Sequence, residues 1–95
     1  MFKDLDPLLH SQLRLSIMSL LISVKEADFS FLKEKTKATV GNLSVQITKL
    51  AEADYITVKK TFEDNYPKTS CSITKKGIKA FEQYVDAIKE YIKKN

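Results

Sequence analysis

The stretch TVGNLSVQITKL, Thr39 to Leu50, decides the fold that this 95-residue sequence predicts. Its apolar residues Leu43, Ile47 and Leu50 recur at spacings of four and three, as they do on the buried face of a helix. Thr39 is a good N-cap, so we expect a helix from about Val40 to Ala53. The other positions carry mainly Asn, Ser, Gln and Thr, whereas a solvated helix surface is usually rich in Glu and Lys. We therefore expect the outer face of this helix to contact a partner.

Two further helices are predicted before this stretch. Asp6 and Pro7 form a helix start, because Asp caps free N–H groups and Pro fits the first turn. The first helix is therefore expected over residues 7–23. Ser30 is then expected to cap a second, shorter helix over residues 31–37.

After the opening stretch the apolar period changes from that of a helix to that of a strand. Residues 55–64 alternate and are rich in β-branched and aromatic side chains, residues 64–67 are a turn signal, and residues 69–74 return as a second strand. These segments predict a hairpin, and residues 27–29 are compatible with a very short strand. A last helix is expected from Thr74 or Lys75 to about Lys93.

The composition excludes several classes of function. No apolar run is long enough to span a membrane, and the N-terminus lacks the features of a signal peptide, so the expected location is the cytoplasm. One Cys and one His cannot build a zinc site without many carboxylates, and no Gly-rich phosphate loop is present. We expect His10 to be a surface or interface residue and Cys71 a small strand residue, with a redox role of that thiol left open. Neither an enzyme nor a bound cofactor or metal is expected.

Positive charge concentrates around the opening stretch. The chain is expected to form one domain over residues 1–95, and its formal net charge is +4. Residues 33–76 hold nine lysines and five acids, which is a net charge of +4 in that segment alone. A local basic field of this kind favours a phosphate backbone as the partner.

A short helix, a tight link and a second helix followed by a hairpin form a helix-turn-helix with a wing. The fold class is thus mostly α with a small β-hairpin, a winged helix-turn-helix (α-α-α-β-β-α) with an extended C-terminal helix. The second helix of such a pair lies in the DNA major groove, where Asn and Gln bond adenine, Ser and Thr are flexible readers and apolar groups touch the thymine methyl. Val45 would read a thymine methyl there, or is an exposed valine if DNA is not the partner. The candidate recognition residues are Thr39, Val40, Asn42, Ser44, Val45, Gln46 and Lys49.

The hairpin is expected to reach the neighbouring minor groove or its phosphates. Basic and small polar side chains around helix 39–53, the reading helix, would then contact the DNA backbone. The acids Glu63 and Asp64 stand close to the turn and would be repelled by phosphates unless they point away. The alternative is a hairpin that only caps the core. The candidate wing and phosphate contacts are Lys37, Lys59, Lys60, Asn65, Lys68, Thr69 and Ser70.

The residues from Thr39 to Phe81 carry a family pattern. It resembles the core of small winged-helix transcriptional regulators of the MarR/ArsR-like superfamily, and the first helix resembles that of a single-domain branch, so the resemblance covers nearly the whole chain. Gln46 stands where His is frequent, and Asp54 stands where Gly usually ends the recognition helix. The matching positions are Thr39, Leu43, Ser44, Ile47, Leu50, Glu52, Tyr55, Ile56, Ile73, Thr74, Gly77, Ala80 and Phe81.

The resemblance implies a homodimer whose interface is formed by the first and last helices. The sequence supports this independently, because the first helix has a second apolar stripe and the last helix is overlong for a core of this size. The alternative is that these two helices pack on each other within one chain. The candidate interface residues are Leu8, Leu15, Met18, Ile22, Tyr84, Ile88, Tyr91 and Ile92.

The expected function is that of a dimeric, sequence-specific transcriptional regulator on double-stranded DNA, acting as a repressor that blocks a promoter. Two-fold symmetry would place two copies of helix 39–53 in successive major grooves of a pseudo-palindrome, with hairpin 55–74 as the wing. A winged helix that binds proteins rather than DNA is the alternative. A metal effector is not expected. An organic effector could sit between the helices at the dimer interface, but no residue set marks a pocket, so the effector is unknown.

Overall fold

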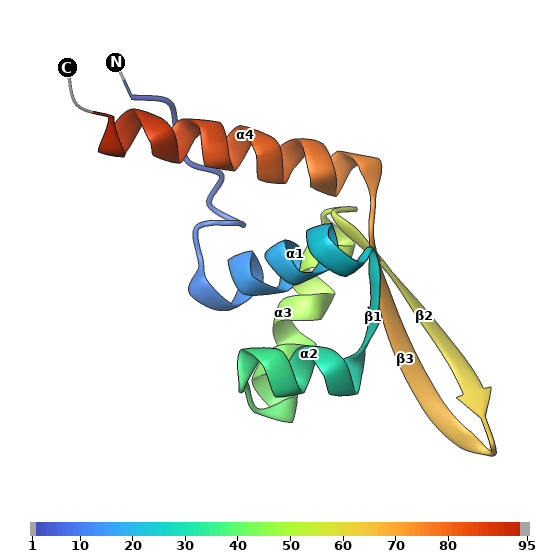
Figure 1. Ribbon diagram of the computed structural model, residues 1–95. Helices are drawn as coiled ribbons and strands as arrows, with labels where there is room; N and C mark the ends of the chain where they lie inside the picture. Colours follow the sequence, from blue (N-terminus) through green and yellow to red (C-terminus); the bar gives the residue numbers. More distant parts are fainter. Residues whose placement is uncertain (1, 94–95) are drawn as a thin grey trace.

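The order of elements is helix, short strand, two helices, hairpin and helix. The computed structural model describes residues 2–93, and within them four helices pack beside a three-stranded antiparallel sheet in the strand order β1-β3-β2 (Figure 1). This is the predicted winged-helix arrangement. The elements are α1 (Gln12–Val24), β1 (Glu26–Asp28), α2 (Phe29–Thr36), α3 (Val40–Glu52), β2 (Ile56–Glu63), β3 (Tyr66–Ile73) and α4 (Lys75–Ile92).

Helix α3 agrees closely with its prediction. The hydroxyl oxygen of Thr39 accepts the N–H of Asn42 at 3.2 Å, which satisfies one of the free N–H groups of the first turn. The three apolar residues of its stripe are at most 5% exposed. After the helix, Asp54 adopts a left-handed conformation with φ 62°, the conformation for which Gly is usual at this place.

Helix α1 begins at Gln12, five residues later than predicted. Asp6 does not cap it, because one of its carboxylate oxygens accepts the N–H of Leu8 at 2.9 Å and the other accepts the hydroxyl of Tyr55. Asp6 therefore closes a turn that precedes the helix. Ser11, which is extended with φ −151°, is the cap instead.

The two apolar stripes of α1 do not divide into a core face and a surface face. The helix contacts α2, α3, α4 and the sheet. Ile17, Met18 and Leu21 are all completely buried. The prediction that Met18 lies at a dimer surface is therefore wrong, because this side of α1 is core within one chain. Ile22 remains 37% exposed.

Helix α2 begins after Asp28 rather than after Ser30. The Asp28 carboxylate accepts the N–H of Phe31 at 2.8 Å, and its extended backbone leaves β1 at the same residue. Ser30 is exposed within the first turn. The short strand predicted at residues 27–29 is present one residue earlier, as β1.

The cap on α2 gives a stability test with a matched control. We expect Asp28→Ala to lower the free energy of unfolding by about 1 kcal/mol, because the N–H of Phe31 loses its partner. Asp28→Asn should keep most of that stability, since Asn also caps. Ser30→Ala should change little. Urea denaturation of the three variants checks this, and an equal loss in Asp28→Ala and Ser30→Ala would place the cap at Ser30 after all.

The turn of the hairpin is shorter than predicted, because only two residues separate the strands. Asp64 and Asn65 both have positive φ, 52° and 67°, as the tight turns that match the strand twist require. Strand β3 consequently begins at Tyr66, three residues before the predicted start. Cys71 lies in β3, which confirms the prediction of a small strand residue. It is completely buried, and burial raises the pKa of its thiol to about 11.

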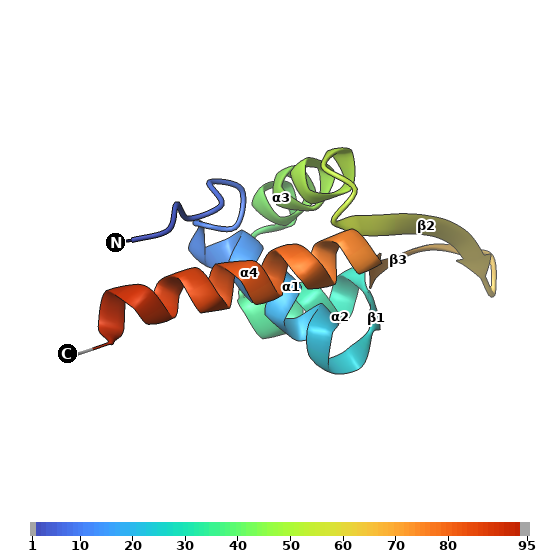
Figure 2. The same ribbon diagram turned by 90° about the horizontal axis from the view of Figure 1, so that it is seen from above.

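Helix α4 runs across the other helices, and the N-terminal segment lies beside its outer half (Figures 1 and 2). The rings of Phe2 and Tyr91 stack with centroids 4.6 Å apart, and Tyr91 donates a hydrogen bond to the Lys3 carbonyl at 3.3 Å. Tyr84 was expected at a dimer surface, but it is 6% exposed and its hydroxyl lies 3.0 Å from Nδ1 of His10. No helix within residues 2–93 combines the length and hydropathy needed to cross a membrane.

Tyr55 ties the N-terminal segment to the junction of α3 and β2. Burial raises its pKa from 10.0 to about 12, and the hydrogen bond to Asp6 and the negative charge of Asp6 add to the effect. Because the folded protein holds this proton more tightly than the unfolded chain, the contribution to stability is full below pH 10.0 and is lost as the pH rises through about 12.

An absorbance titration of the tyrosinate band measures this shift directly. We expect a late phase from Tyr55, which should be absent in Tyr55→Phe. Asp6→Asn should move the phase only part of the way back, since burial is the larger cause. A late phase that persists in Tyr55→Phe would contradict the half-buried hydrogen bond between Tyr55 and Asp6 as its source.

Candidate nucleic-acid interface

The outward face of α3 carries mainly uncharged polar and apolar side chains, together with Lys49. Asn42, Ser44 and Lys49 are exposed, and Val40 and Val45 are 54% and 50% exposed. No acidic residue occurs between Val40 and Lys49. This face can therefore approach a polyanion without repulsion from an acid, and it presents polar groups that can form hydrogen bonds with a partner.

Gln46 is not a free side chain on this face, in contrast to the prediction. It is half-buried, its Oε1 accepts a hydrogen bond from Nη1 of Arg14, and its Nε2 donates to Oδ1 of Asn42 at 2.9 Å. Arg14 was not predicted as a site residue, because only the packing of α1 on α3 brings together two positions 32 residues apart. Thr39 is exposed, but its hydroxyl oxygen serves as the helix cap.

The wing carries side chains on two opposite faces. Neighbouring residues of a strand point to opposite faces, and residues paired across antiparallel strands share a face. Lys59 and Lys60 therefore cannot both face α3. The core-side face of the wing holds the pairs Val58–Cys71, Lys60–Thr69 and Phe62–Pro67, and the outer face holds Lys59–Ser70, Thr61–Lys68 and Glu63–Tyr66.

A groove of about 910 Å³ separates α3 from the core-side face of the wing. Ser44 and Thr48 line it from α3, and Lys60 lines it from β2. Thr48 was not predicted, although it is exposed and lies one helical turn after Ser44, whose carbonyl accepts its hydroxyl at 2.9 Å. Glu52 also lines the groove and is the one acid of α3. Lys60 is thus the wing lysine that lies beside the reading helix.

On the outer face of the wing, one lysine lies close to two acids. Nζ of Lys68 lies 3.2 Å from the Glu63 carboxylate and 3.9 Å from that of Asp28. These are exposed pairs of modest strength. They show that Glu63 points away from the groove, and they lower the availability of Lys68 for a phosphate.

The wing tip differs from its prediction. Thr69 and Ser70 were expected near the turn, but both are half-buried within β3, because the strand begins at Tyr66. Asn65 remains exposed at the turn. The most exposed large side chains here are Phe62 and Tyr66, 80% and 73% exposed, which were not predicted as site residues. Their position next to the hairpin turn is the feature of the sequence from which their exposure could have been predicted.

The link between α2 and α3 places a basic group at the start of the reading helix. Lys37 is exposed and left-handed with φ 59°, and its N–H donates to the Lys33 carbonyl at 2.9 Å. The N-terminus of a helix attracts anions. Lys37 therefore adds positive charge where α3 already favours a phosphate.

The chain matches the sequence model of the family described as winged helix DNA-binding domain over residues 13–92. An uncharacterized protein of Methanocaldococcus jannaschii is 37% identical over 76 residues, which are 80% of this chain and 83% of that protein. The transcriptional regulator homologue protein of Pyrococcus horikoshii OT3 superposes with a TM-score of 0.83 at 28% identity, covering 90% of this chain and 84% of that one. The YusO protein of Bacillus subtilis shares the fold, with a TM-score of 0.73 at 14% identity over 86% of this chain and 57% of that one.

The sequence match, the fold and the geometry of the interface agree. Helix, link, helix and wing follow one another along the chain, and the similar structure from Pyrococcus horikoshii OT3 is described as a transcriptional regulator homologue. Because the family match spans most of the chain, this protein belongs to the winged helix DNA-binding domain family.

Proposed function

We propose that the protein is a dimeric, sequence-specific transcriptional regulator that binds double-stranded DNA with α3 in the major groove. The observation that carries the proposal is the outward face of α3, on which exposed amide, hydroxyl and valine side chains occur without an acid from Val40 to Lys49. Side chains of these types read base edges, whereas lysines contact phosphates without selecting sequence. Lys37 and Lys60 flank this face and supply that second kind of contact.

In this proposal the wing follows the DNA backbone beside the reading helix. The groove between α3 and the core-side face of the wing takes a phosphate strand, with Lys60 on its wing side. Phe62, 80% exposed at the end of the same face, lies against sugars of the neighbouring minor groove. Lys49 and Asn65 contact phosphates at the two ends of this path.

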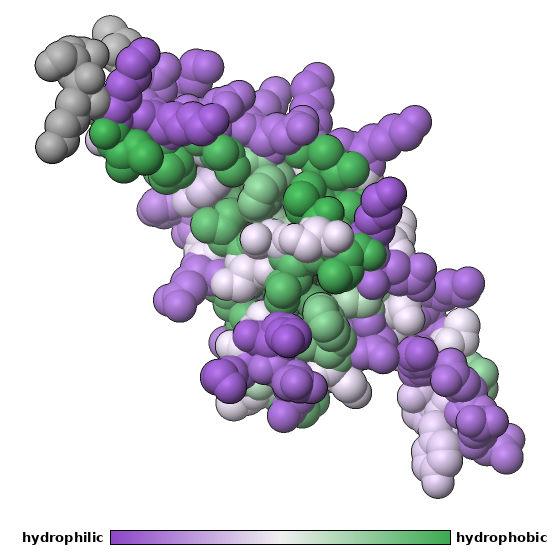
Figure 3. Space-filling view, viewed as in Figure 1, coloured by the Kyte–Doolittle hydropathy of each residue, from purple (hydrophilic) through white to green (hydrophobic). Residues whose placement is uncertain are grey.

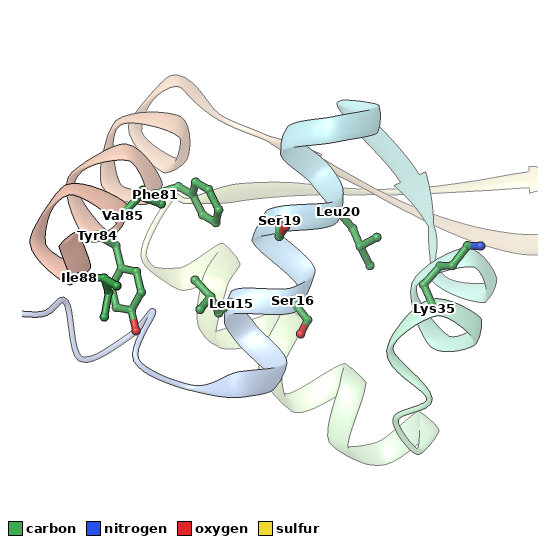
Figure 4. A pocket seen from close by; sticks show the side chains of 9 residues that line it. All are labelled: Leu15, Ser16, Ser19, Leu20, Lys35, Phe81, Tyr84, Val85 and Ile88. Atoms are coloured by element: carbon green, nitrogen blue, oxygen red, sulfur yellow. The ribbon is translucent and has the colours of Figure 1, made fainter. Parts of the chain in front are cut away.

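A second copy of the chain covers the side formed by α1 and α4 in the proposed dimer. A groove of about 630 Å³ lies between these helices, and Leu15, Phe81 and Ile88 line it (Figure 4). Figure 3 shows a band of hydrophobic surface beneath α4 on the same side. Ile92 is 71% exposed at the end of α4 and extends this apolar surface. Removal of apolar surface from water favours association of two chains. Leu8, Ile22 and Tyr91 complete the proposed interface.

Selection of bound sequences from random duplex DNA tests the proposal. We expect enrichment of an inverted repeat whose half-sites lie about one helical turn apart, as two symmetric reading helices require. Asn42→Ala and Gln46→Ala should each reduce that preference. Analytical ultracentrifugation should give a dimer. An absent gel shift at low salt together with no enriched motif would favour a winged helix that binds a protein.

The proposed direction of regulation is repression, since a dimer seated on a promoter blocks access to it. A reporter gene placed behind the selected repeat measures this. Expression should fall when the protein is supplied and should be unchanged with a scrambled repeat. Higher expression with the intact repeat would make the protein an activator.

A further inference from the structure

Arg14 connects α1 to the reading face through a continuous chain of hydrogen bonds. It is the only arginine of the sequence and the only charged residue of α1. Its Nε donates to the carbonyl of Leu8 at 2.5 Å, and its Nη1 donates to Oε1 of Gln46. Nε2 of Gln46 then donates to Oδ1 of Asn42 at 2.9 Å. The chain thus begins at a half-buried guanidinium and ends on the exposed face of α3.

The chemistry of a guanidinium sets the direction of every bond in this chain. Arg has five N–H donors and no acceptor, so only the oxygen of the Gln46 amide can face it. The Gln46 NH₂ group must then face Asn42 and meet the oxygen of that amide. The NH₂ group of Asn42 is left at the outer end of the chain, on the side away from Gln46. Both amide oxygens are engaged within the protein.

We propose that Arg14 is a positioning residue that determines which bases α3 reads, a role that rests on the proposed DNA-binding function. With both amide oxygens engaged, Asn42 presents N–H donors to the major groove. Guanine offers two acceptors there, N7 and O6, and thymine offers O4, whereas adenine offers only N7 and its bidentate contact needs an amide oxygen as well as an N–H. The half-site is therefore expected to carry guanine or thymine, rather than adenine, opposite Asn42.

Arg14→Met tests this role, because it removes all five donors while keeping a long side chain. The freed amides can turn, so we expect the preference against adenine at one position of each half-site to fall by about tenfold. Arg14→Lys keeps a donor-only group and should restore part of the preference. In a Gln46→Leu background, Arg14→Met should change the base preference no further, because Gln46→Leu has already removed the hydrogen bonds that link Arg14 to Asn42.

Two further measurements separate positioning from other roles. The side-chain NH₂ resonances of Gln46, recorded by NMR without DNA, should shift in Arg14→Met and shift less in Arg14→Lys. The dependence of DNA affinity on salt should stay unchanged in Arg14→Met, whereas loss of a phosphate contact lowers its slope by about 1 per contact. Thermal unfolding of each variant reports whether it is folded under these conditions.

Each outcome decides between the proposals. Unchanged Gln46 resonances in Arg14→Met would contradict the claim that Arg14 fixes the orientation of the Gln46 and Asn42 amides. Shifted resonances with an unchanged base preference would contradict the role of Arg14 in base reading. A reduced dependence of DNA affinity on salt would also contradict that role, because it would make Arg14 a phosphate contact. If the wild-type protein enriches no DNA motif at all, the proposed function fails, and the role of Arg14 in base reading fails with it. The Gln46 resonances still decide whether Arg14 fixes the two amides.

Discussion

Gly77→Ala is expected to destabilise the protein by about 3 kcal/mol, the largest stability change predicted for a single methyl group in this chain. A Cβ at Gly77 would lie 2.1 Å from the carbonyl oxygen and 2.9 Å from the carbonyl carbon of Tyr55. That backbone cannot move aside easily, because the Tyr55 N–H donates to the Leu50 carbonyl at 3.0 Å and its own carbonyl accepts the N–H of Thr74 at 3.1 Å. The first turn of α4 would have to shift away from the end of α3.

Gly41→Ala is the matched control for this prediction. Gly41 also lies in a helix, but within residues 2–93 no atom other than those of its chain neighbours and the backbone of its own helix comes within 4 Å of a Cβ placed there. The substitution should therefore stabilise α3 by about 0.5–1 kcal/mol, the usual gain for replacing an exposed helical Gly by Ala. Urea denaturation and thermal unfolding compare the two variants, and the melting temperature of Gly77→Ala should fall by more than about 10 °C. Equal stabilities would mean that the contact at Tyr55 is not a constraint.

Much of the fold could be predicted because its decisive signals are local. Thr39 and Thr74 cap their helices as expected, since a cap acts on N–H groups three residues away. The start of the first helix was wrong because Asp6 binds the hydroxyl of Tyr55, 49 residues distant. Asp28 replaced Ser30 as a cap because β1 ends there, and the sequence does not show that this strand pairs with β3.

The exposed residues of the candidate interface could be predicted where their exposure follows the helical period. They could not be predicted where a side chain is engaged by another element. The exposure of Val45 and Asn42 follows from the spacing of the buried residues in α3. The engagement of Gln46 by Arg14 does not, because no periodic pattern relates the two helices. Met18 was placed on a surface by its stripe, yet the elements around α1 bury it. Such misplacement is expected wherever a helix is covered on more than one side.

Alternation along β2 leads to the second large prediction, which concerns DNA affinity. Lys59 and Lys60 are neighbours of the same charge and size, and both are exposed. Only Lys60 lines the groove beside α3, whereas Lys59 lies on the outer face with Lys68. The pair therefore offers a comparison in which net charge is held constant and only the face of the wing differs.

Lys60→Ala is expected to weaken binding to every DNA sequence by about 60-fold at 0.1 M salt. Each lysine–phosphate contact adds about 0.9 to the slope of log affinity against log salt, which is roughly eightfold between 1 M and 0.1 M. A dimer loses two contacts, so its slope should fall by about 2 while its base preference is unchanged. Fluorescence anisotropy over a salt series measures both quantities.

Lys59→Ala should retain most of the affinity, because its side chain points away from the groove. A larger loss in Lys59→Ala than in Lys60→Ala would place the DNA on the outer face of the wing and contradict the proposed path of the backbone.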